Sequence, residues 1–269
     1  MGTDAAMMTR RAFLAAGAGL AAAACGGSNG RIVRGQGPSG PTKTSPSPPT
    51  TLPIGSSLTK VPTLALPPAT KPAFFVKDVI SSPPPSAAAL TIDDGPDPRY
   101  TPAVLALLAE FGVHANFCVI GQSASRFPGL LIDIINQGHS LTNHTMNHPQ
   151  QFASLSTERL RVEIVGGLEA IYDATGGFAS STFRSPGGEW SPAIYAILGE
   201  LGMIPIDWNV DPRDFSRPGV SAITAKLLRA NPGDILLCHD GGGDRSETVT
   251  ALRTVIPALQ KRGLTFVTL

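Results

Sequence analysis

From residue 88 onward, short apolar runs alternate with segments of helical periodicity, and this alternation constrains the fold most. Strands are predicted over 88–92, 115–120, 181–183, 203–207, 234–238 and 264–268. Helices are predicted over 101–111, 125–137, 155–174, 191–201, 220–229 and 247–261. Strict alternation produces parallel strands joined by crossover helices. An open doubly wound sheet and a β/α barrel both fit. Since about 180 residues is short for the ~250 of a full barrel, any barrel must be incomplete or distorted.

Residues 1–25 have the features of an export signal. Arg10 and Arg11 are followed by Phe-Leu and by an apolar stretch over 12–24 that ends in small residues before Cys25. The arginine pair resembles a twin-arginine signal, and Cys25 stands where lipoprotein signals place their lipidated cysteine. We expect export and a lipid anchor at the outer face of the cell membrane. The alternative is an ordinary cleaved signal with an incidental cysteine, which would leave the protein in the cell wall or secreted.

Residues 26–87 are dominated by proline, serine, threonine and glycine, and 13 of the 25 prolines fall within 31–90. Such a segment buries too little apolar surface to offset its ordering entropy, so we predict a mostly disordered tether. The alternative for Phe74, Phe75 and Val76 is a short strand or plug that docks on the domain. The catalytic domain is predicted over 88–269.

The charge of the chain is unevenly distributed. Residues 91–269 hold 13 Lys and Arg against 18 Asp and Glu, a net charge of −5. An acidic folded part argues against nucleic acid as a partner. No apolar run reaches the ~18–20 residues of a membrane-spanning helix, so we expect membrane contact only through the N-terminal anchor. We also expect a monomer. Three cysteines cannot build a disulfide scaffold, and Cys118 and Cys238, inside apolar strands, are predicted to be buried free thiols.

Groups capable of chemistry stand at or shortly after the ends of the predicted strands. They are Asp93 and Asp94, His144 and His148, Arg184, Asp207 to Asp214, and His239. In both candidate architectures the active site lies at the carboxyl ends of the strands. Solvated surface residues would not recur at so many strand ends. The sequence therefore predicts one active site built from these groups.

A metal site is predicted from three of these groups. His144 and His148 are four residues apart, which suits joint metal capture, and the turn at Gly95-Pro96 lets one of two adjacent carboxylates bind a cation while the other stays free as a base. Two histidines and one carboxylate leave coordination positions open, as a catalytic metal requires. Zn²⁺ is the first choice, and Co²⁺, Mn²⁺, Ni²⁺ or Fe²⁺ also fit. The alternative is a plain turn or helix cap for the carboxylates.

The remaining groups supply proton transfer and charge stabilisation. A guanidinium at Arg184 can hold a carboxylate ionised through a two-pronged hydrogen bond. Gly187 and Gly188 permit close approach of backbone N–H groups to a developing oxyanion. His239 leaves a buried strand, and with a buried carboxylate partner it can serve as a general acid. His114 and His139 do not join the metal spacing and are predicted to pack structurally.

From about residue 88 to residue 269, these segments resemble the polysaccharide deacetylases, also named NodB-homology or carbohydrate esterase family 4 enzymes. Five motifs stand in the order of that family: Thr91 to Pro96, Asn143 to His148, Arg184 to Pro186, Asp211 to Phe215 and Leu237 to His239. The family fold is a distorted, incomplete β/α barrel of parallel strands. This expectation agrees with the length of the domain.

The resemblance implies a role for each motif residue. The catalytic residues would be the base Asp93, the Arg184 that orients it, the acid His239 and its partner Asp214. The ligands of one divalent metal ion would be Asp94, His144 and His148. The substrate and oxyanion residues would be the Gly187 backbone N–H, Phe215 in place of a common Trp, and the wall residue Leu237. The family usually has Tyr or Phe where this chain has Gly187, so an aromatic wall is lost.

The activity that the resemblance implies is hydrolytic removal of N-acetyl groups from an acetylated polysaccharide, with release of acetate. For an exported, anchored enzyme, the amino sugars of peptidoglycan are the obvious acetylated polymer within reach. One alternative is an O-acetyl esterase or small-amide hydrolase that uses the same site. A third hypothesis is a surface carbohydrate-binding lipoprotein whose hydrolase site has decayed, and it ranks last because neither the base nor any metal ligand is missing.

Overall fold

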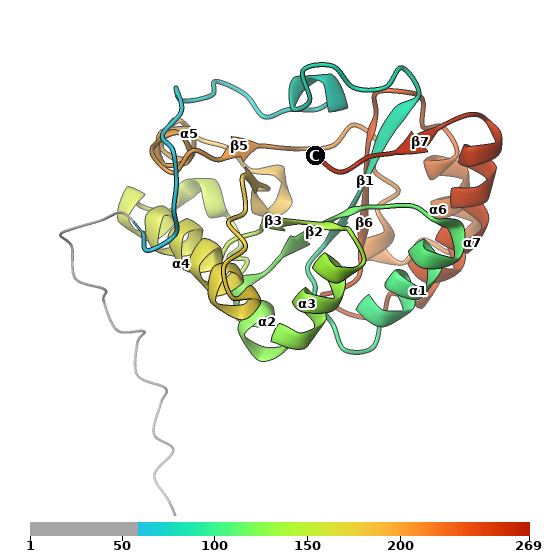
Figure 1. The fold of residues 1–269 in the computed structure, drawn as a ribbon, viewed down its shortest axis with the longest axis horizontal. Helices are drawn as coiled ribbons and strands as arrows, with labels where there is room; N and C mark the ends of the chain where they lie inside the picture. Colours follow the sequence, from blue (N-terminus) through green and yellow to red (C-terminus); the bar gives the residue numbers. More distant parts are fainter. Residues whose placement is uncertain (1–58) are drawn as a thin grey trace, which may run out of the picture. The chain divides into compact units, whose positions relative to one another are not determined.

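The structure is a computed structural model that describes residues 59–269. Its seven strands are all parallel and lie inside a layer of helices (Figure 1). The strands are β1 (Ala87–Asp93), β2 (Asn116–Val119), β3 (Ser140–Asn143), β4 (Thr182–Phe183), β5 (Ile204–Pro205), β6 (Ile235–His239) and β7 (Thr265–Phe266). The helices are α1 (Thr101–Phe111), α2 (Gly121–Arg126), α3 (Pro128–Asn136), α4 (Thr157–Thr175), α5 (Pro192–Glu200), α6 (Val220–Leu227) and α7 (Ser246–Lys261).

The strand order identifies the architecture. Six strands follow one another as β5-β4-β3-β2-β1-β6, and β7 pairs with the beginning of β1. A closed barrel of six strands would have the same order with β6 also paired to β5. The sheet is therefore a barrel that is open between β5 and β6, which confirms the predicted incomplete β/α barrel and excludes the open doubly wound sheet.

The two faces of β1 differ in chemistry. Leu90 and Ile92 belong to the main apolar core, which also contains side chains of α1, α3, α6 and α7. Because side chains alternate along a strand, Thr91 and Asp93 point to the opposite face. In the parallel register Asp93 lies beside His239 of β6. The apolar residues of the outer face thus direct two predicted catalytic side chains toward the barrel interior.

Residues 73–76 occupy the gap between the edge strands β5 and β6. The backbone N–H of Ala73 donates to the carbonyl of Pro205 at the end of β5 (2.8 Å), and that of Val76 donates to the carbonyl of Gly233 just before β6 (2.9 Å). The side chain of Val76 is fully buried. This segment therefore fills the opening of the barrel with backbone hydrogen bonds and one apolar plug.

Three sequence expectations differ from the structure. The tether predicted over 26–87 does not hold for its last part, because residues 73–76 dock as the plug that was the alternative. The helix predicted over 125–137 is two helices, since Pro128 begins α3 and constrains the residue before it to a non-helical conformation. Strand β3 was given no predicted range, although His144 and His148 were expected at a strand end, because its Ser-Leu-Thr-Asn sequence has a single apolar residue.

Some predictions concern residues outside those described. The export signal over 1–25, the lipidation site at Cys25 and the tether as far as residue 58 all lie there. Within residues 59–269, no helix is long and apolar enough to cross a membrane. Cys118 and Cys238 are buried and free, as predicted.

Candidate active site

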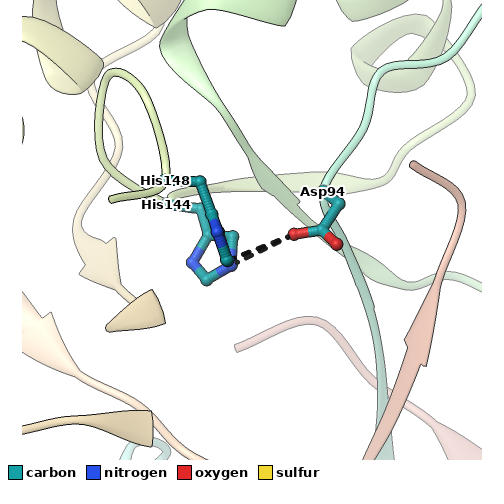
Figure 2. Close-up of side chains that lie close together, drawn as sticks. All are labelled: Asp94, His144 and His148. Atoms are coloured by element: carbon teal, nitrogen blue, oxygen red, sulfur yellow. Dashed lines mark ion pairs between the residues drawn. The ribbon is translucent and has the colours of Figure 1, made fainter. Parts of the chain in front are cut away.

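The three predicted metal ligands meet at the carboxyl ends of β1 and β3. Asp94 follows β1 directly, and His144 follows β3. The Oδ1 atom of Asp94 lies 3.5 Å from Nε2 of His144 and 3.5 Å from Nε2 of His148. Figure 2 shows the carboxylate and both imidazoles turned toward one another. Side chains separated by about fifty positions in the sequence therefore form one cluster.

The donor set fits a divalent cation. The ligand atoms of Asp94, His144 and His148 all lie within 4.8 Å of one another. Ligand atoms bound to a tetrahedral zinc at about 2.0–2.2 Å are separated by about 3.4 Å, close to the observed Oδ1–Nε2 distances. The buried Oδ1 atom of Asp94 makes no hydrogen bond within the described residues. A buried carboxylate oxygen without a hydrogen bond, beside two imidazole nitrogens, is what a cation site requires.

A hydrogen bond on the far side of the ring sets the tautomer of His144. Its Nδ1 lies 2.8 Å from the backbone carbonyl oxygen of Arg184. A carbonyl can only accept, so Nδ1 carries the proton and the lone pair of Nε2 faces Asp94. The residue that follows β4 thereby orients a ligand that follows β3.

The loop that carries both histidines is held by buried side chains that the sequence did not reveal. Thr145 N–H donates to Asn143 Oδ1 (3.0 Å), and His148 N–H donates to Thr145 Oγ1 (3.0 Å). Glu163 on α4 accepts from the backbone N–H and the side-chain amide of Asn147 (2.9 and 3.1 Å). Thr145 and His148 have left-handed backbones, φ 65° and 52°. Such conformations persist where the surroundings enforce them.

The loop after β6 presses against Asp94, which also has a left-handed backbone (φ 74°). A Cβ on Gly241 would lie 2.1 Å from the Asp94 carbonyl oxygen, and one on Gly242 would lie 2.8 Å from its Oδ2. The buried Arg245 donates to the carbonyls of Gly241 and Gly242 (2.6 and 3.0 Å). Two glycines of this loop therefore pack closely on Asp94, and Arg245 donates to their carbonyls.

The electrostatics of the cluster favour a cation. Burial opposes ionisation of Asp94, but His144, His239 and His148 outweigh it and hold its pKa well below the usual range. Burial also opposes a charge on His144, but Asp94 and Asp93 raise its pKa. Burial and the neighbouring His144 lower the pKa of His148. The cluster therefore holds an ionised carboxylate, and His148 tends to the neutral form that binds metal.

Asp93 is buried beside this cluster and paired with Arg184. The Arg184 guanidinium donates through Nη1 to Asp93 Oδ1 (2.8 Å) and to the hydroxyl of Thr91 (2.6 Å). Its Nη2 donates to the backbone carbonyl of Asp207 (3.0 Å). The expected two-pronged bond is thus a single bond; Thr91 and Asp207 each accept a further donor, and the buried Nε makes no hydrogen bond within the described residues. The second oxygen of Asp93 lies 3.8 Å from His144 Nε2 and faces the cluster.

A second ion pair joins His239 to Asp214. The Nδ1 of His239 lies 2.7 Å from Asp214 Oδ1, and its backbone N–H donates to Oδ2 (2.8 Å). Thr248 on α7 also donates to Oδ2 (2.8 Å). Burial disfavours the charged imidazole, but Asp214 and then Asp93 and Asp94 raise the pKa of His239 to about 9. Burial likewise opposes ionisation of Asp214, yet His239 lowers its pKa. His239 is therefore a charged proton donor at neutral pH.

The predicted substrate and oxyanion residues lie in different environments. Gly187, in the turn after β4, is exposed, and its backbone N–H makes no hydrogen bond within the described residues. The ring of Phe215 is 45% exposed and meets the His239 ring edge-on at 5.7 Å. Leu237 is 2% exposed, on the same face of β6 as His239. Phe215 and Gly187 offer surface to a substrate, whereas Leu237 offers little.

The residues left out of the site occupy structural positions. Asp97 Oδ1 accepts from the N–H groups of Arg99 and Tyr100, and so forms a turn. His139 precedes β3, at the opposite end of that strand from His144, and its ring packs against Phe117 and His114. Both histidines pack structurally, as predicted.

Comparison with known proteins identifies the family. A family model described as polysaccharide deacetylase matches residues 81–206. The peptidoglycan-N-acetylglucosamine deacetylase of Bacillus cereus is 42% identical over 184 residues, which are 67% of this chain and 84% of that protein. The chain belongs to the polysaccharide deacetylase family. It is therefore a hydrolase of the class that acts on carbon–nitrogen bonds.

Two further relatives support this assignment. The chitooligosaccharide deacetylase of Sinorhizobium fredii is 40% identical over 185 residues, 65% of this chain and 86% of that protein. A crystal structure of a peptidoglycan N-acetylglucosamine deacetylase, in complex with 4-naphthalen-1-yl-N-oxidanyl-benzamide, superposes with a TM-score of 0.67 at 32% identity. That match covers 73% of this chain and 90% of that one. The names of these relatives specify two different glycans, peptidoglycan and chitooligosaccharide, so they do not identify the substrate of this deacetylase.

Proposed function

We propose that this enzyme removes N-acetyl groups from the amino sugars of an acetylated cell-envelope polysaccharide of the peptidoglycan type, releasing acetate. The observation that carries the proposal is the arrangement of two oppositely charged groups beside one cluster of metal-type ligands. Asp93 and His239 lie side by side on β1 and β6, and each is fixed by its own buried partner. An amide has a poor leaving group, so its hydrolysis needs a base and an acid together.

Each residue then has a defined task. Asp94, His144 and His148 would hold a divalent cation, Zn²⁺ first, which when bound polarises the acetyl carbonyl and lowers the pKa of water. Asp93, held in place by the Arg184 guanidinium, removes a proton from the attacking water.

The remaining steps use a backbone donor and the acid. The free N–H of Gly187 donates to the oxygen on which negative charge develops. His239, oriented by Asp214, gives its proton to the leaving nitrogen. The products are acetate and a sugar with a free amine.

We also propose that the chain acts outside the membrane. The twin-arginine-like signal and Cys25 favour an exported lipoprotein, and a proline-rich tether before residue 73 would let the domain reach a polymer that lies off the membrane. We propose a monomer, whose contact with the membrane is the N-terminal anchor alone.

Acetate release by the full chain tests the activity. We expect acetate from acetylated glucosamine oligomers and from peptidoglycan, together with one new amine per acetate. The Asp93→Asn variant should lose this activity and keep its fold. Acetate released with an alcohol instead of an amine would favour an O-acetyl esterase. Glycan binding by metal-loaded, folded protein without acetate release would contradict the proposal and favour a carbohydrate-binding protein.

A further inference from the structure

A hollow of about 490 Å³ lies next to the proposed site, and the residues assigned to catalysis do not line it. Its lining is a mixture of aromatic, amide, hydroxyl and carboxylate groups: Gln151, Ala153, Ser154, Glu189 and Trp190. Aromatic surface with a few polar groups is common in small-molecule sites. The hollow is broadly open to solvent.

Two chain segments connect the hollow to the proposed site. Gln151 comes three residues after the ligand His148, and Glu189 comes two residues after the proposed oxyanion donor Gly187. A Cβ added to Gly187 would lie 3.8 Å from Cγ and 3.9 Å from Oε1 of Glu189. Because Gly187 has no side chain, nothing at that position separates Glu189 from the oxyanion donor. A glycan chain that enters the catalytic site can therefore place a neighbouring sugar against Glu189.

The side chains of the hollow are held in place. Glu189 Oε2 accepts the backbone N–H of Ala153 (3.2 Å). The indole N–H of Trp190 donates to Asp207 Oδ2 (2.9 Å), and its ring stacks on Tyr195 at 5.5 Å with 3° between the planes. Phe183 also packs against the indole, with ring centroids 6.1 Å apart. Glu189 Oε1 and the part of the indole that lines the hollow are left to meet a ligand.

The hollow has a negative charge without a counter-ion. Glu189 Oε1 makes no hydrogen bond or ion pair among the residues that the structure describes, and no Lys or Arg belongs to the lining. The carboxylate of Asp207 lies behind Trp190. A carboxylate beside an indole attracts an ammonium group through a charge-assisted hydrogen bond and a cation–π contact.

We propose that this hollow binds an amino sugar with a free ammonium group, in the same glycan chain whose next N-acetylated sugar occupies the catalytic site. The inference rests on the proposed function and names its substrate class, a partly deacetylated glycan. Each reaction leaves an amine on the chain, so a product sugar in the hollow would favour reaction at its neighbour.

The experiment measures the affinity of the full chain for two tetramers, one of glucosamine and one of N-acetylglucosamine. The Asp93→Asn background prevents consumption of the acetylated ligand, and calorimetry reads both affinities at low salt. Glu189→Gln keeps an oxygen for the Ala153 N–H but removes the charge, so the preference for the cationic tetramer should fall about tenfold. Glu110→Gln, an exposed glutamate paired with Arg253, is the matched control and should keep that preference.

A second variant keeps the test decisive if Glu189→Gln does not fold. Ser154→Lys places a positive charge at an exposed position of the hollow, and it should also lower the preference for the cationic tetramer. An unchanged preference in both variants, or an equal loss for both tetramers, would overturn the inference. Acetate release by the wild type is measured separately, so that failure of the proposed function is distinguished from failure of the hollow.

Discussion

Two buried ion pairs lie beside the candidate metal ligands, and their polarity is opposite. In Asp93–Arg184 the cation is completely buried, and a carboxylate oxygen faces the ligands. In His239–Asp214 the carboxylate is the more buried partner, at 1% exposure, and the imidazole is the more exposed, at 8%. The hidden partner in each pair makes a short hydrogen bond to the other, and Asp214 raises the pKa of His239. The same arrangement, a reactive side chain hydrogen-bonded to a more deeply buried partner of opposite charge, can therefore provide the base Asp93 on β1 and the acid His239 on β6.

The largest expected effect follows from replacing the reactive residue of either pair, Asp93 or His239. Asp93→Asn and His239→Gln should each lower kcat by about 10²–10⁴-fold, because each removes one proton-transfer group. Acetate release measures the loss, and circular dichroism checks the fold. The double variant should fall little further than the worse single variant, because the two groups act in one reaction. Full activity in either single variant would remove that residue from the mechanism.

The next largest effect is on stability, and it compares the buried Asp93–Arg184 pair with an exposed ion pair. Arg184→Met leaves a buried carboxylate without its partner and should lower the free energy of unfolding by about 3–5 kcal/mol. Urea denaturation measures the change. Arg253→Met, which removes an exposed partner of Glu110, is the matched control and should change stability by about 1 kcal/mol or less. Equal losses in the two variants would contradict the special burial of the first pair.

The pairs also differ in pH dependence, because only His239 can lose its proton near neutrality. With a pKa of about 9, His239 should keep kcat high until the pH approaches 9. Asp214→Asn removes the main cause of the raised pKa of His239. The basic limb of the pH–rate profile should therefore move toward the ordinary histidine pKa of about 6.5, which leaves about 30-fold less protonated imidazole at pH 8. A pH–rate profile of each protein tests this. If the wild type and the variant lost activity over the same basic pH range, Asp214 would not be what raises the pKa of His239.

The same substitution should change stability with a defined sign. The folded pKa of His239 is raised, so the pair stabilises the fold fully below pH 6.5, and this contribution is lost as the pH rises through about 9. Asp214→Asn should therefore cost stability at pH 6 and progressively less above pH 9. Urea denaturation at several pH values measures the difference. A difference in the free energy of unfolding between wild type and variant that grows with pH would contradict the pairing of His239 with Asp214.

The smallest expected effect tests the outer face of β1. Ile92→Val removes one methylene from the apolar core, next to Asp93 in sequence but on the opposite face of the strand, and should cost about 0.5–1.5 kcal/mol of stability. kcat should stay within about twofold, since no polar partner of Asp93 is lost. Denaturation and acetate release measure the two quantities. A large loss of kcat would show that the two faces are not independent.

The parallel β/α arrangement could be predicted because the apolar strands β1 and β6 and the long helices carry strong periodicity. The positions of Asp93, Asp94 and His239 follow from those strands, since active groups of such folds stand at strand ends. Strand β3 is too short and too polar to show such a pattern. It is recognised only when its neighbours β2 and β4 supply hydrogen bonds to its backbone.

The residues that hold the site in place could not be predicted. Glu163 follows Arg159 by one helical turn, a spacing typical of an exposed pair, yet it is buried beneath the histidine loop. Thr248, on the last helix, donates to Asp214, and Arg245, just before that helix, donates to the carbonyl of Phe215, so both have partners that are distant in sequence. The plug at Val76 was only the alternative prediction, because the surrounding prolines favour a disordered tether. Tertiary packing decides each of these positions, and local sequence does not encode it.

The central claim is that Asp94, His144 and His148 bind one ion that catalysis requires. The most direct measurement is the rate of acetate release from N-acetylglucosamine tetramer by the full chain after chelation, followed by titration with Zn²⁺. We expect loss of activity in the metal-free protein and complete recovery at one equivalent of metal per chain. Undiminished acetate release by metal-free protein would contradict it.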